Sequence, residues 1–409
     1  MVQVYGYREL SNKQISDKNT LYQTASMSKA INAVAVLKLV EEGKISLDED
    51  IRKYLKTWHF PDNKFSDSKK ITLENLLSHT GGLGTSGFFG YNIKDSIPTL
   101  NQILDGKAPA NSDAVIPINY PDVAYLYSGG GTTVIRKILE DRFNKDYSEM
   151  IRTILLKPLK INRSTYNRPL DQYEKNYAVG YFGENQMIEG GYHIFPELAP
   201  DGLWSTSNDI GKVIVSIQHS LQGNPSLLNK ESVLTMFARV IPSSNYALGF
   251  VVEEKGNETY FSHRGANYGY RGVFYGSMTS GKGIVVLTNS EHGEPLINEV
   301  VNSVAIAYNW KGFYNPPIKK LIAISPNDID SLVGDYSNGD ATFLIRNKNG
   351  KLEMTGNSTE VLYPIGNRKF FLLSTPNINV HFDFSNDEKT AHTLTIQENG
   401  KILITAIKK

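Results

Sequence analysis

A serine and a lysine stand three residues apart, at Ser26 and Lys29, directly before a strongly apolar stretch. Apolar residues from Ala30 to Val40 cover nearly every face of a helix, which is typical of a buried one, and Gly43 marks its end. Because residues i and i+3 are neighbours on a helix, Lys29 should reach the Ser26 hydroxyl. We expect burial to lower the pKa of Lys29, so that a neutral amine takes the serine proton. The helix N-terminus adds free N–H groups where an oxyanion would form.

The same spacing occurs again at Ser66 and Lys69 and serves as an internal control. This second copy lies in a polar, turn-rich stretch, residues 61–70, which is typical of a solvated loop. Nothing there would desolvate the lysine, so we interpret Ser66 as structural. For Ser26, the residues alone leave one alternative open: a serine that caps the helix, with a lysine in its first turn.

Composition limits the classes of function. The 409 residues can form two or three domains with a sizeable core. A formal net charge of +1, without a dense basic cluster, argues against nucleic-acid binding. No apolar run is long enough to span a bilayer. Cys is absent, which excludes disulfides and thiolate metal sites, and the eight His residues show no metal-binding spacing. We therefore expect neither a metal nor a cofactor.

The N-terminal residues 1–7 resemble the inside of a strand, with no charged or apolar leader before them. Either the protein is cytoplasmic, or the sequence lacks a leader and belongs to a secreted or cell-envelope protein.

Helical and strand patterns divide the chain into two parts. Residues 1–310 predict an α+β domain, an antiparallel sheet flanked by helices. Residues 311–326, which include the pair Pro316-Pro317, predict a linker. Residues 327–409, with turns such as Asn349-Gly350, predict a small all-β barrel or sandwich domain. Helices are expected near 30–40, from Ser46, and over 72–77, 130–143, 147–156, 206–221 and 293–310; strands are expected over 246–253, 258–263, 272–278 and 283–289.

Tyr127 is the candidate proton shuttle. It precedes Ser128 and Gly129 at a predicted loop-to-helix junction, where functional residues are often displayed. A tyrosine beside a lysine ammonium has a lowered pKa and can pass protons to a leaving group. With 23 tyrosines in the chain, an ordinary core or surface role is the alternative for Tyr127 taken alone. Tyr336 stands in a closer Tyr-x-Asn match, but it lies in the β-rich tail and we interpret it as structural.

A third motif, His263-Arg264-Gly265-Ala266, follows a predicted strand. The Ala266 N–H could serve as a second oxyanion donor beside that of Ser26, and Gly265 would let the strand approach a substrate closely. His263 and Arg264 could hold a substrate carboxylate or polarise the Tyr127 hydroxyl. A strand end with an exposed His-Arg pair is the alternative for this motif taken alone.

Together these motifs resemble the serine hydrolases related to class C β-lactamases, a group that includes D-aminopeptidases, D-Ala-D-Ala carboxypeptidases and β-lactamase-like esterases. The resemblance runs from about Tyr5 to Trp310 and includes the stretches 24–29, 43–48, 76–83, 155–159 and 201–206. His79 falls in one of these stretches, in a turn that we interpret as structural.

The resemblance implies Ser26 as the nucleophile, Lys29 as the base and Tyr127 as the proton shuttle, with residues 263–265 on the cleft strand. Among the positions that depart from the family pattern, two bear on the substrate. Gly129 stands where many relatives have a substrate-binding Asn, and His263 stands where β-lactamases usually have Lys. These departures favour a peptidase or an esterase over an efficient β-lactamase.

We therefore expect a serine hydrolase that cleaves a small ester or a D-amino-acid peptide through an acyl-enzyme on Ser26. Its partner would be a small-molecule or peptide substrate, with no nucleic acid and no membrane span, and the sequence leaves the oligomeric state open. The competing interpretation is a non-enzyme of the same fold, either a penicillin-binding sensor or a catalytically degenerate binding protein.

Overall fold

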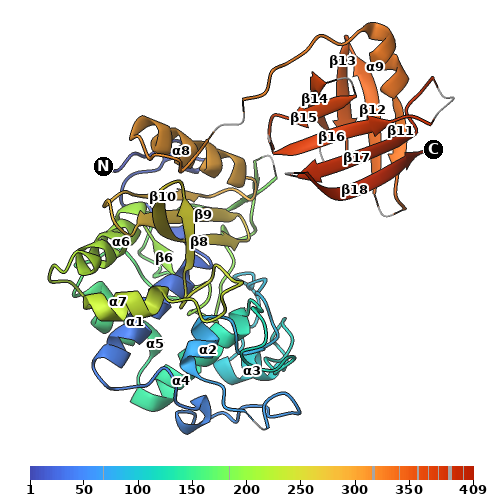
Figure 1. The fold of residues 1–409 in the computed structure, drawn as a ribbon. Helices are drawn as coiled ribbons and strands as arrows, with labels where there is room; N and C mark the ends of the chain where they lie inside the picture. Colours follow the sequence, from blue (N-terminus) through green and yellow to red (C-terminus); the bar gives the residue numbers. More distant parts are fainter. Residues whose placement is uncertain are drawn as a thin grey trace. The chain divides into compact units, whose positions relative to one another are not determined.

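The computed structural model describes residues 1–67, 69–183, 185–315, 318–339, 341–356, 359–366, 368–375, 377–385, 389–398 and 400–409. The chain forms two compact units, Met1–Tyr314 and Asn315–Lys409 (Figure 1). The pair Pro316-Pro317, on which the expected linker was based, lies outside the described residues. The limits expected for the domains and the linker stay predictions.

A four-stranded antiparallel sheet forms the centre of the first unit. Its order is β10-β9-β8-β7, with β7 at Val251–Lys255, β8 at Glu258–Asn267, β9 at Tyr270–Ser277 and β10 at Gly283–Thr288. Neighbouring residues on β8 face opposite ways, as the two-residue period of a strand requires. Phe261 packs into the main helical core, whereas Tyr260 packs into a smaller cluster with α8 (Glu294–Ala307).

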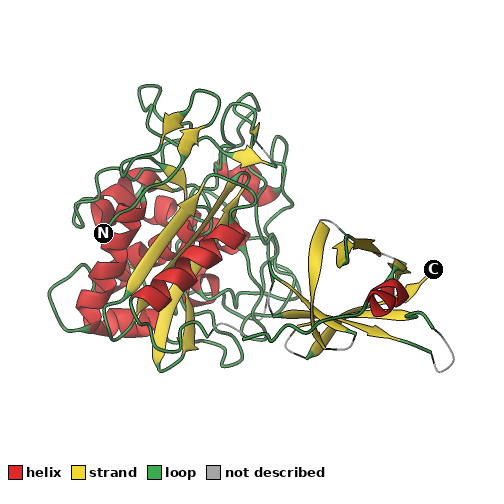
Figure 2. Cartoon of the chain, turned by 90° about the horizontal axis from the view of Figure 1, so that it is seen from above, coloured by secondary structure: helices red, strands yellow, loops and turns green. Residues whose placement is uncertain are grey.

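Helices therefore cover both faces of this sheet (Figures 1 and 2). The expected fold class, an α+β domain with an antiparallel sheet flanked by helices, is confirmed. The other helices of the first unit are α1 (Met27–Glu41), α2 (Leu73–Leu77), α3 (Leu100–Asp105), α4 (Gly129–Phe143), α5 (Tyr147–Ile151, continued by a π-helical turn at Arg152–Leu156), α6 (Ser207–Leu221) and α7 (Lys230–Phe237).

Two features of this helical layer differ from the sequence prediction. The helix expected from Ser46 is reduced to a 3₁₀ turn at Ile51–Lys53, which Asp50 caps through the Arg52 N–H. The short helices α3 and α7 were not predicted, because their apolar patterns are too brief to show a helical period.

Helix α1 has the burial that its sequence predicts. Every residue from Gln23 to Leu37 is buried except Ser26, which is half-buried. The helix ends at Gly43, whose positive φ of 66° suits glycine. There the Gly43 N–H donates to the Val40 carbonyl and the Lys44 N–H to the Leu39 carbonyl, the two bonds of a Schellman cap. The sequence thus places a single accessible hydroxyl at the start of a buried helix.

Three short strand pairs complete the first unit. They are β1 (Tyr7–Glu9) with β2 (Gln14–Ile15), β3 (Tyr22–Gln23) with β6 (Trp204–Ser205), and β4 (Tyr181–Phe182) with β5 (Gln186–Met187). The pair β3–β6 matters for function, because β3 leads directly into Ser26.

The second unit is a closed antiparallel barrel of eight strands, preceded by helix α9 (Pro326–Leu332). Of the two expected forms, a barrel and a sandwich, the structure shows the barrel. Tyr336 is fully buried in its core and donates to the Leu332 carbonyl over 2.8 Å, which confirms a structural role. The strands are β11 (Gly334–Ser337), β12 (Thr342–Lys348), β13 (Lys351–Thr355), β14 (Thr359–Gly366), β15 (Lys369–Leu372), β16 (Ile378–Asp383), β17 (Thr393–Glu398) and β18 (Lys401–Lys408).

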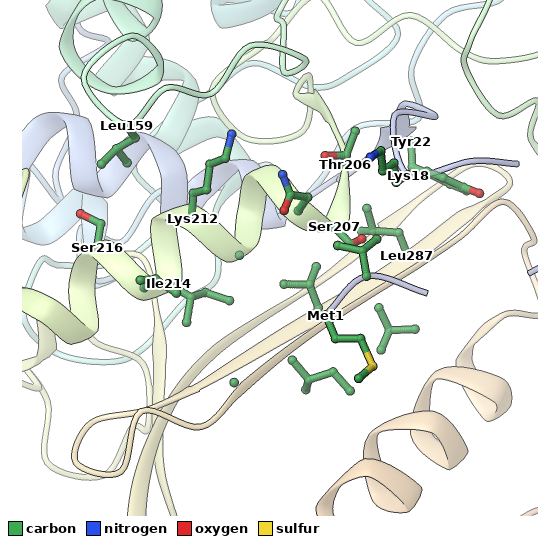
Figure 3. A pocket seen from close by; sticks show the side chains of 18 of the residues that line it. Met1, Lys18, Tyr22, Leu159, Thr206, Ser207, Lys212, Ile214, Ser216 and Leu287 are labelled. Atoms are coloured by element: carbon green, nitrogen blue, oxygen red, sulfur yellow. The ribbon is translucent and has the colours of Figure 1, made fainter. Parts of the chain in front are cut away.

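A large groove of about 1850 Å³ lies in the first unit, between α6 and the edge strand β10 (Figure 3). Met1, Lys212 and Leu287 are among the residues that line it. None of the predicted site residues belongs to its described lining, so the groove is separate from the predicted chemistry. None of the helices in the described ranges has the length and hydropathy that a bilayer crossing requires.

Candidate active site

The Ser26 hydroxyl lies between a lysine and a carboxylate at the N-terminal end of α1. Lys29 Nζ donates to Ser26 Oγ over 2.9 Å, and Ser26 Oγ donates to Asp201 Oδ1 over 2.9 Å. Lys29 Nζ also contacts Asp201 Oδ1 at 3.2 Å. The Lys29 and Asp201 side chains are 2% and 6% exposed. Of the three groups, the half-buried serine is therefore the one open to a substrate.

The pKa of Lys29 moves opposite to the expected direction. Burial by itself lowers this pKa, but the charge of Asp201 and the neighbouring Tyr127 hydroxyl outweigh burial and raise it. The expectation of a neutral amine is therefore wrong, because the ammonium form is stabilised by an ion pair. Sequence reasoning missed this partner: Asp201 lies 172 residues beyond Lys29, and no local pattern connects the two.

The short pair β3–β6 brings Asp201 to the start of α1. Its register sets Gln23 opposite Trp204. Gln23 is three residues before Ser26, and Trp204 is three residues after Asp201. Asn267, the last residue of β8, ties the two segments together: its Nδ2 donates to Gln23 Oε1 over 2.8 Å and to the Asp201 carbonyl over 3.1 Å. The serine, the carboxylate and the end of β8 are thus parts of one connected network.

Tyr127 lies beside the lysine, with Lys29 Nζ 5.1 Å from the centre of its ring. The ring of His79 packs against Tyr127 at 4.4 Å between centroids, and His79 Nδ1 accepts the Ser128 N–H over 3.2 Å. Ser128 in turn caps α4 through the Gly131 N–H. His79 therefore supports the turn that presents Tyr127, as its expected structural role requires.

His263 has other partners than those predicted. Its Nε2 accepts from the Tyr246 hydroxyl over 2.9 Å, and its Nδ1 donates to the Arg264 carbonyl over 2.6 Å. Burial, together with the charge of Lys29, lowers the pKa of His263 to about 3. A neutral ring with both nitrogens engaged offers no charge to a substrate carboxylate. The hydroxyl that it contacts belongs to Tyr246 rather than Tyr127, so both expected roles are wrong.

Arg264 lies on the opposite face of β8 and points toward α8. Its guanidinium pairs with Glu294 and donates to Asn298 Oδ1 over 2.9 Å, both on that helix. His263 lies on the side of the cluster formed by Ser26, Lys29 and Asp201. Because successive side chains alternate along a strand, Arg264 must face the other way. The predicted role of Arg264 in holding a substrate carboxylate is therefore wrong.

Gly265 brings the backbone of β8 against the segment that precedes Ser26. A Cβ at this position would meet the Thr24 carbonyl oxygen at 2.2 Å and the Ala25 Cβ at 3.2 Å. β7 pairs with β8 only as far as Ser262, so within the described sheet the stretch that ends with Ala266 is paired on one side alone, by β9. This strand edge therefore lies next to the segment that leads into Ser26.

The N-terminus of α1 supplies the other donor. In the described part of the chain, the Ser26 N–H has no hydrogen-bond acceptor. Ala25, the residue before it, has a positive φ of 49°, an uncommon conformation for a side chain with a Cβ. An accessible hydroxyl, a free N–H and a buried cation at one helix end form a site suited to acyl transfer.

Gly129 begins α4 and lies beneath a loop. Its N–H donates to the Ser86 carbonyl over 3.0 Å, and a Cβ would meet that oxygen at 3.1 Å and the Phe88 ring at 3.2 Å. A longer side chain at this position would require the loop to move. The structure therefore gives Gly129 no group with which to bind a substrate amide.

The second Ser-x-x-Lys copy differs from the first, although not entirely as predicted. Lys69 is exposed, as a solvated loop implies, but Ser66 is only 1% exposed. The Ser66 hydroxyl donates to Asp62 Oδ1 over 3.0 Å, and its carbonyl accepts from Arg52. Ser66 thus holds a turn together, which agrees with a structural role.

The described residues contain no group of three or more His, Cys, Asp or Glu side chains arranged to hold a metal ion.

Comparison with known proteins places these features in context. The family model described as Beta-lactamase matches residues 1–304. Penicillin-binding protein 4* of Bacillus subtilis is 24% identical, over 97% of this chain and 89% of its own. The teichoic acid D-alanine hydrolase of Staphylococcus aureus is 26% identical, over 75% of this chain and 72% of its own.

A solved structure extends the similarity of fold to the whole chain. The octameric penicillin-binding protein homologue from Pyrococcus abyssi superposes with a TM-score of 0.63 at 19% identity, covering 99% of this chain and 90% of its own.

Proposed function

The chain belongs to the beta-lactamase family, and from this premise we propose that it is a serine hydrolase that cleaves D-amino-acid esters or amides through an acyl-enzyme on Ser26. One observation carries the proposal: at the N-terminus of α1, the half-buried Ser26 hydroxyl lies 2.9 Å from both Lys29 Nζ and Asp201 Oδ1. A hydroxyl held between a cation and a proton acceptor, at a helix N-terminus, is an activated nucleophile.

In the proposed reaction, Ser26 Oγ attacks the carbonyl carbon of the substrate. The N–H groups of Ser26 and Ala266 stabilise the oxyanion of the tetrahedral intermediate. Lys29 and Tyr127 handle the protons, with Tyr127 delivering one to the leaving group. Water then attacks the acyl-enzyme and releases the acid.

Two features support a D-amino-acid ester or peptide over a β-lactam. Gly129 presents no amide side chain, and His263 is a neutral residue bound to Tyr246 rather than a free cation. A relative that shares 26% identity over 75% of this chain is named a D-alanine hydrolase. We propose by the same reasoning that small molecules or short peptides are the substrates.

We also propose a division of labour along the chain. Residues 1–310 form the hydrolase domain, residues 311–326 form a linker, and residues 327–409 form a β domain with a separate role. The catalytic groups all come from the first of these segments, which supports this division.

The test combines covalent labelling with turnover. The full chain is incubated with a fluorophosphonate and, separately, with a penicillin, and adducts are located by mass spectrometry. p-Nitrophenyl esters and D-Ala peptides are then assayed with the wild type and Ser26→Ala. We expect a fluorophosphonate adduct on Ser26 and turnover that disappears in the variant. If neither reagent forms an adduct on Ser26, the hydrolase proposal is refuted. A long-lived penicillin adduct without turnover would instead identify a penicillin-binding sensor.

A further inference from the structure

We propose that Asp201, rather than Lys29, takes the proton from Ser26 when the serine attacks. This inference rests on the acyl-transfer function proposed above and assigns its first proton transfer to an atom. Asp201 Oδ1 contacts the reacting oxygen directly, at 2.9 Å. Lys29 then remains a cation and stabilises the negative charge that develops on Ser26 Oγ.

The pattern of hydrogen bonds around Lys29 gives the first reason. Its Nζ donates to three acceptors: Ser26 Oγ at 2.9 Å, the Pro200 carbonyl at 3.1 Å and Asp201 Oδ1 at 3.2 Å. An ammonium has three N–H donors, one for each of these acceptors, and the neighbouring Tyr127 side chain is a further hydrogen-bond partner. A neutral amine would have only two donors for these three acceptors. The geometry fits a lysine that donates to the serine, which leaves it no lone pair with which to accept the serine proton.

The serine gives the second reason. A hydroxyl has a single proton to donate, and the Ser26 oxygen already accepts from Lys29. Its proton therefore points to Asp201 Oδ1, the other group within hydrogen-bond distance. The proton path of the resting structure already leads from the serine to the carboxylate.

The surrounding charges favour this assignment. The Asp201 charge raises the pKa of Lys29 above its usual value, so the amine form is scarce at neutral pH. Burial, together with the charge of Lys29, lowers the pKa values of His79 and His263, which leaves both rings neutral. Burial, with a smaller contribution from the negative charge of Asp201, raises the pKa of Glu197 to about 8. Asp201 is thus the carboxylate that directly contacts the serine hydroxyl.

Asp201 is held firmly enough to act at a fixed distance. Its N–H and that of Gly202 both donate to the Leu198 carbonyl, and a Cβ at Gly202 would meet Leu198 Cα at 2.7 Å. Asn267 anchors the Asp201 carbonyl from the other side at 3.1 Å. A tight turn and a strand end therefore fix the carboxylate against Ser26.

The protons and electrons of the step balance as follows. Ser26 Oγ forms a bond to the carbonyl carbon, the π pair moves to the carbonyl oxygen, and the serine proton moves to Asp201 Oδ1. When the intermediate collapses, the bond to the leaving group breaks and the leaving atom takes a proton from Tyr127. Tyr127 is refilled from Lys29, and Lys29 from Asp201. For hydrolysis of the acyl-enzyme, water attacks the acyl carbonyl carbon, and its proton passes through Tyr127 and Lys29 to Asp201. The bond between the acyl carbon and Ser26 Oγ then breaks, and Ser26 Oγ takes the proton from Asp201.

Asp201→Asn tests this assignment, with Asp141→Asn as the matched control. Asp141 is also buried and lies 3.2 Å from a lysine, Lys137, but outside the proposed site. We expect Asp201→Asn to lower kcat/KM for D-Ala-p-nitroanilide by at least about 100-fold from pH 6 to 10, and Asp141→Asn to stay within about threefold. Asp201→Glu, which keeps a carboxylate, should recover part of the loss.

The alternative predicts the opposite. If neutral Lys29 were the base, removing the Asp201 charge would lower its pKa, so Asp201→Asn would keep or gain activity at pH 7 and its rate would level off at lower pH. That result overturns the proposal.

The wild-type pH profile gives a test that does not depend on any variant folding. With Asp201 as the acceptor, kcat/KM forms a plateau from about pH 6 to 9. With a neutral lysine as the base, kcat/KM rises about tenfold per pH unit in that range, a result that would refute the assignment. A wild type that neither turns over substrate nor labels at Ser26 would refute the hydrolase function itself, so the two failures are distinguishable.

Discussion

Two buried lysine–aspartate pairs in the first unit have the same separation and a similar partner. Lys29 and Asp201 lie 3.2 Å apart, as do Lys137 and Asp141. In both pairs the lysine donates to a hydroxyl that in turn donates to the carboxylate, Ser26 Oγ in the first and Thr57 Oγ1 in the second. A hydroxyl, a cation and a carboxylate in contact are therefore insufficient to define an active site.

The pairs differ in what else surrounds them. Asp141 also accepts the N–H groups of Lys56 and Thr57, and these bonds, against the effect of burial, lower its pKa and make it a poor proton acceptor. Among the described residues, the Asp201 carboxylate accepts only from Ser26 and Lys29. The difference shows that the carboxylate beside Ser26 has hydrogen-bonding capacity that the carboxylate of Asp141 has already used.

The backbone around the two hydroxyls differs as well. Ser26 stands at the N-terminus of α1 with a free N–H and faces the edge of β8, which approaches at Gly265. Lys137 and Asp141 are four residues apart within α4, where the N–H groups bond to carbonyls of the same helix. The first cluster has a place for an oxyanion and the second has none.

Replacing the two hydroxyls should give the largest contrast. Ser26→Ala removes the nucleophile, and we expect kcat/KM for a D-alanyl ester to fall by at least about 10⁴-fold. Thr57→Val removes the corresponding hydroxyl of the other cluster and should leave kcat/KM within about threefold. Equal losses in the two variants would mean that the clusters are not functionally distinct. Ester hydrolysis measured on both proteins, with circular dichroism to verify folding, decides this.

Replacing the two lysines separates activity from stability. Lys29→Met and Lys137→Met each leave a buried carboxylate without its cation, so both should lower the free energy of unfolding, by about 3 kcal/mol. Only Lys29→Met should also lower kcat, by about 10³-fold, because its ammonium stabilises the reacting oxygen. Urea denaturation and steady-state kinetics on the same preparations provide the comparison. Retention of full activity by Lys29→Met would contradict a role in the reaction.

Gly265 offers a test of the strand edge that distinguishes the Ser26 cluster. A Cβ there would lie 2.2 Å from the Thr24 carbonyl oxygen, so Gly265→Ala must push β8 away from the nucleophile. We expect about a 100-fold loss of kcat, the scale of a displacement of about 1 Å. Gly211→Ala in α6 is the matched control, since nothing lies within 4 Å of its Cβ, and it should leave kcat unchanged. A Gly265→Ala enzyme with normal kcat would show that the edge takes no part in catalysis.

Lowering the pH should produce the smallest of these effects, a loss of folding stability. Burial, with the charge of Lys29, lowers the pKa of His263 from about 6.5 in the unfolded chain to about 3. Between these values the unfolded state binds a proton that the folded state does not, so stability falls as the pH falls from about 6.5 toward 3. The loss from this group is about 1.4 kcal/mol per pH unit.

His263→Gln should therefore flatten the dependence of unfolding free energy on pH between 6 and 4 by about that slope, measured by urea denaturation. An unchanged slope would show that His263 is charged in the folded protein. His79, whose pKa is also lowered, contributes in the same direction and is left intact in the variant.

The sequence predicted the parts of the site that depend on local pattern. The buried helix, its accessible serine and the lysine one turn later follow from apolar periodicity, and the four sheet strands follow from β-rich runs between turns. The tyrosine beside the lysine followed from a family resemblance and lies at the N-terminus of α4.

The parts that were missed depend on long-range pairing. Asp201 reaches Ser26 only through β3–β6, two-residue strands that no periodicity reveals. Its absence from the prediction is why the pKa of Lys29 was given the wrong direction. The roles of His263 and Arg264 were wrong for a related reason: a sequence shows that strand neighbours alternate, but not which face meets the site. Tyr246, the partner of His263, was missed in the same way.

The pairing of β3 with β6 also bears on when the protein becomes reactive during its synthesis. The bond from Thr24 to the Leu203 carbonyl closes a loop of 179 residues, and the bond from Asn267 to Gln23 spans 244. A ribosome-bound chain that has emerged only as far as α4 already contains Ser26, Lys29 and Tyr127, but it lacks Asp201 and the strand β8. Contacts of such long range form slowly, so we expect an incomplete chain to carry an inert serine.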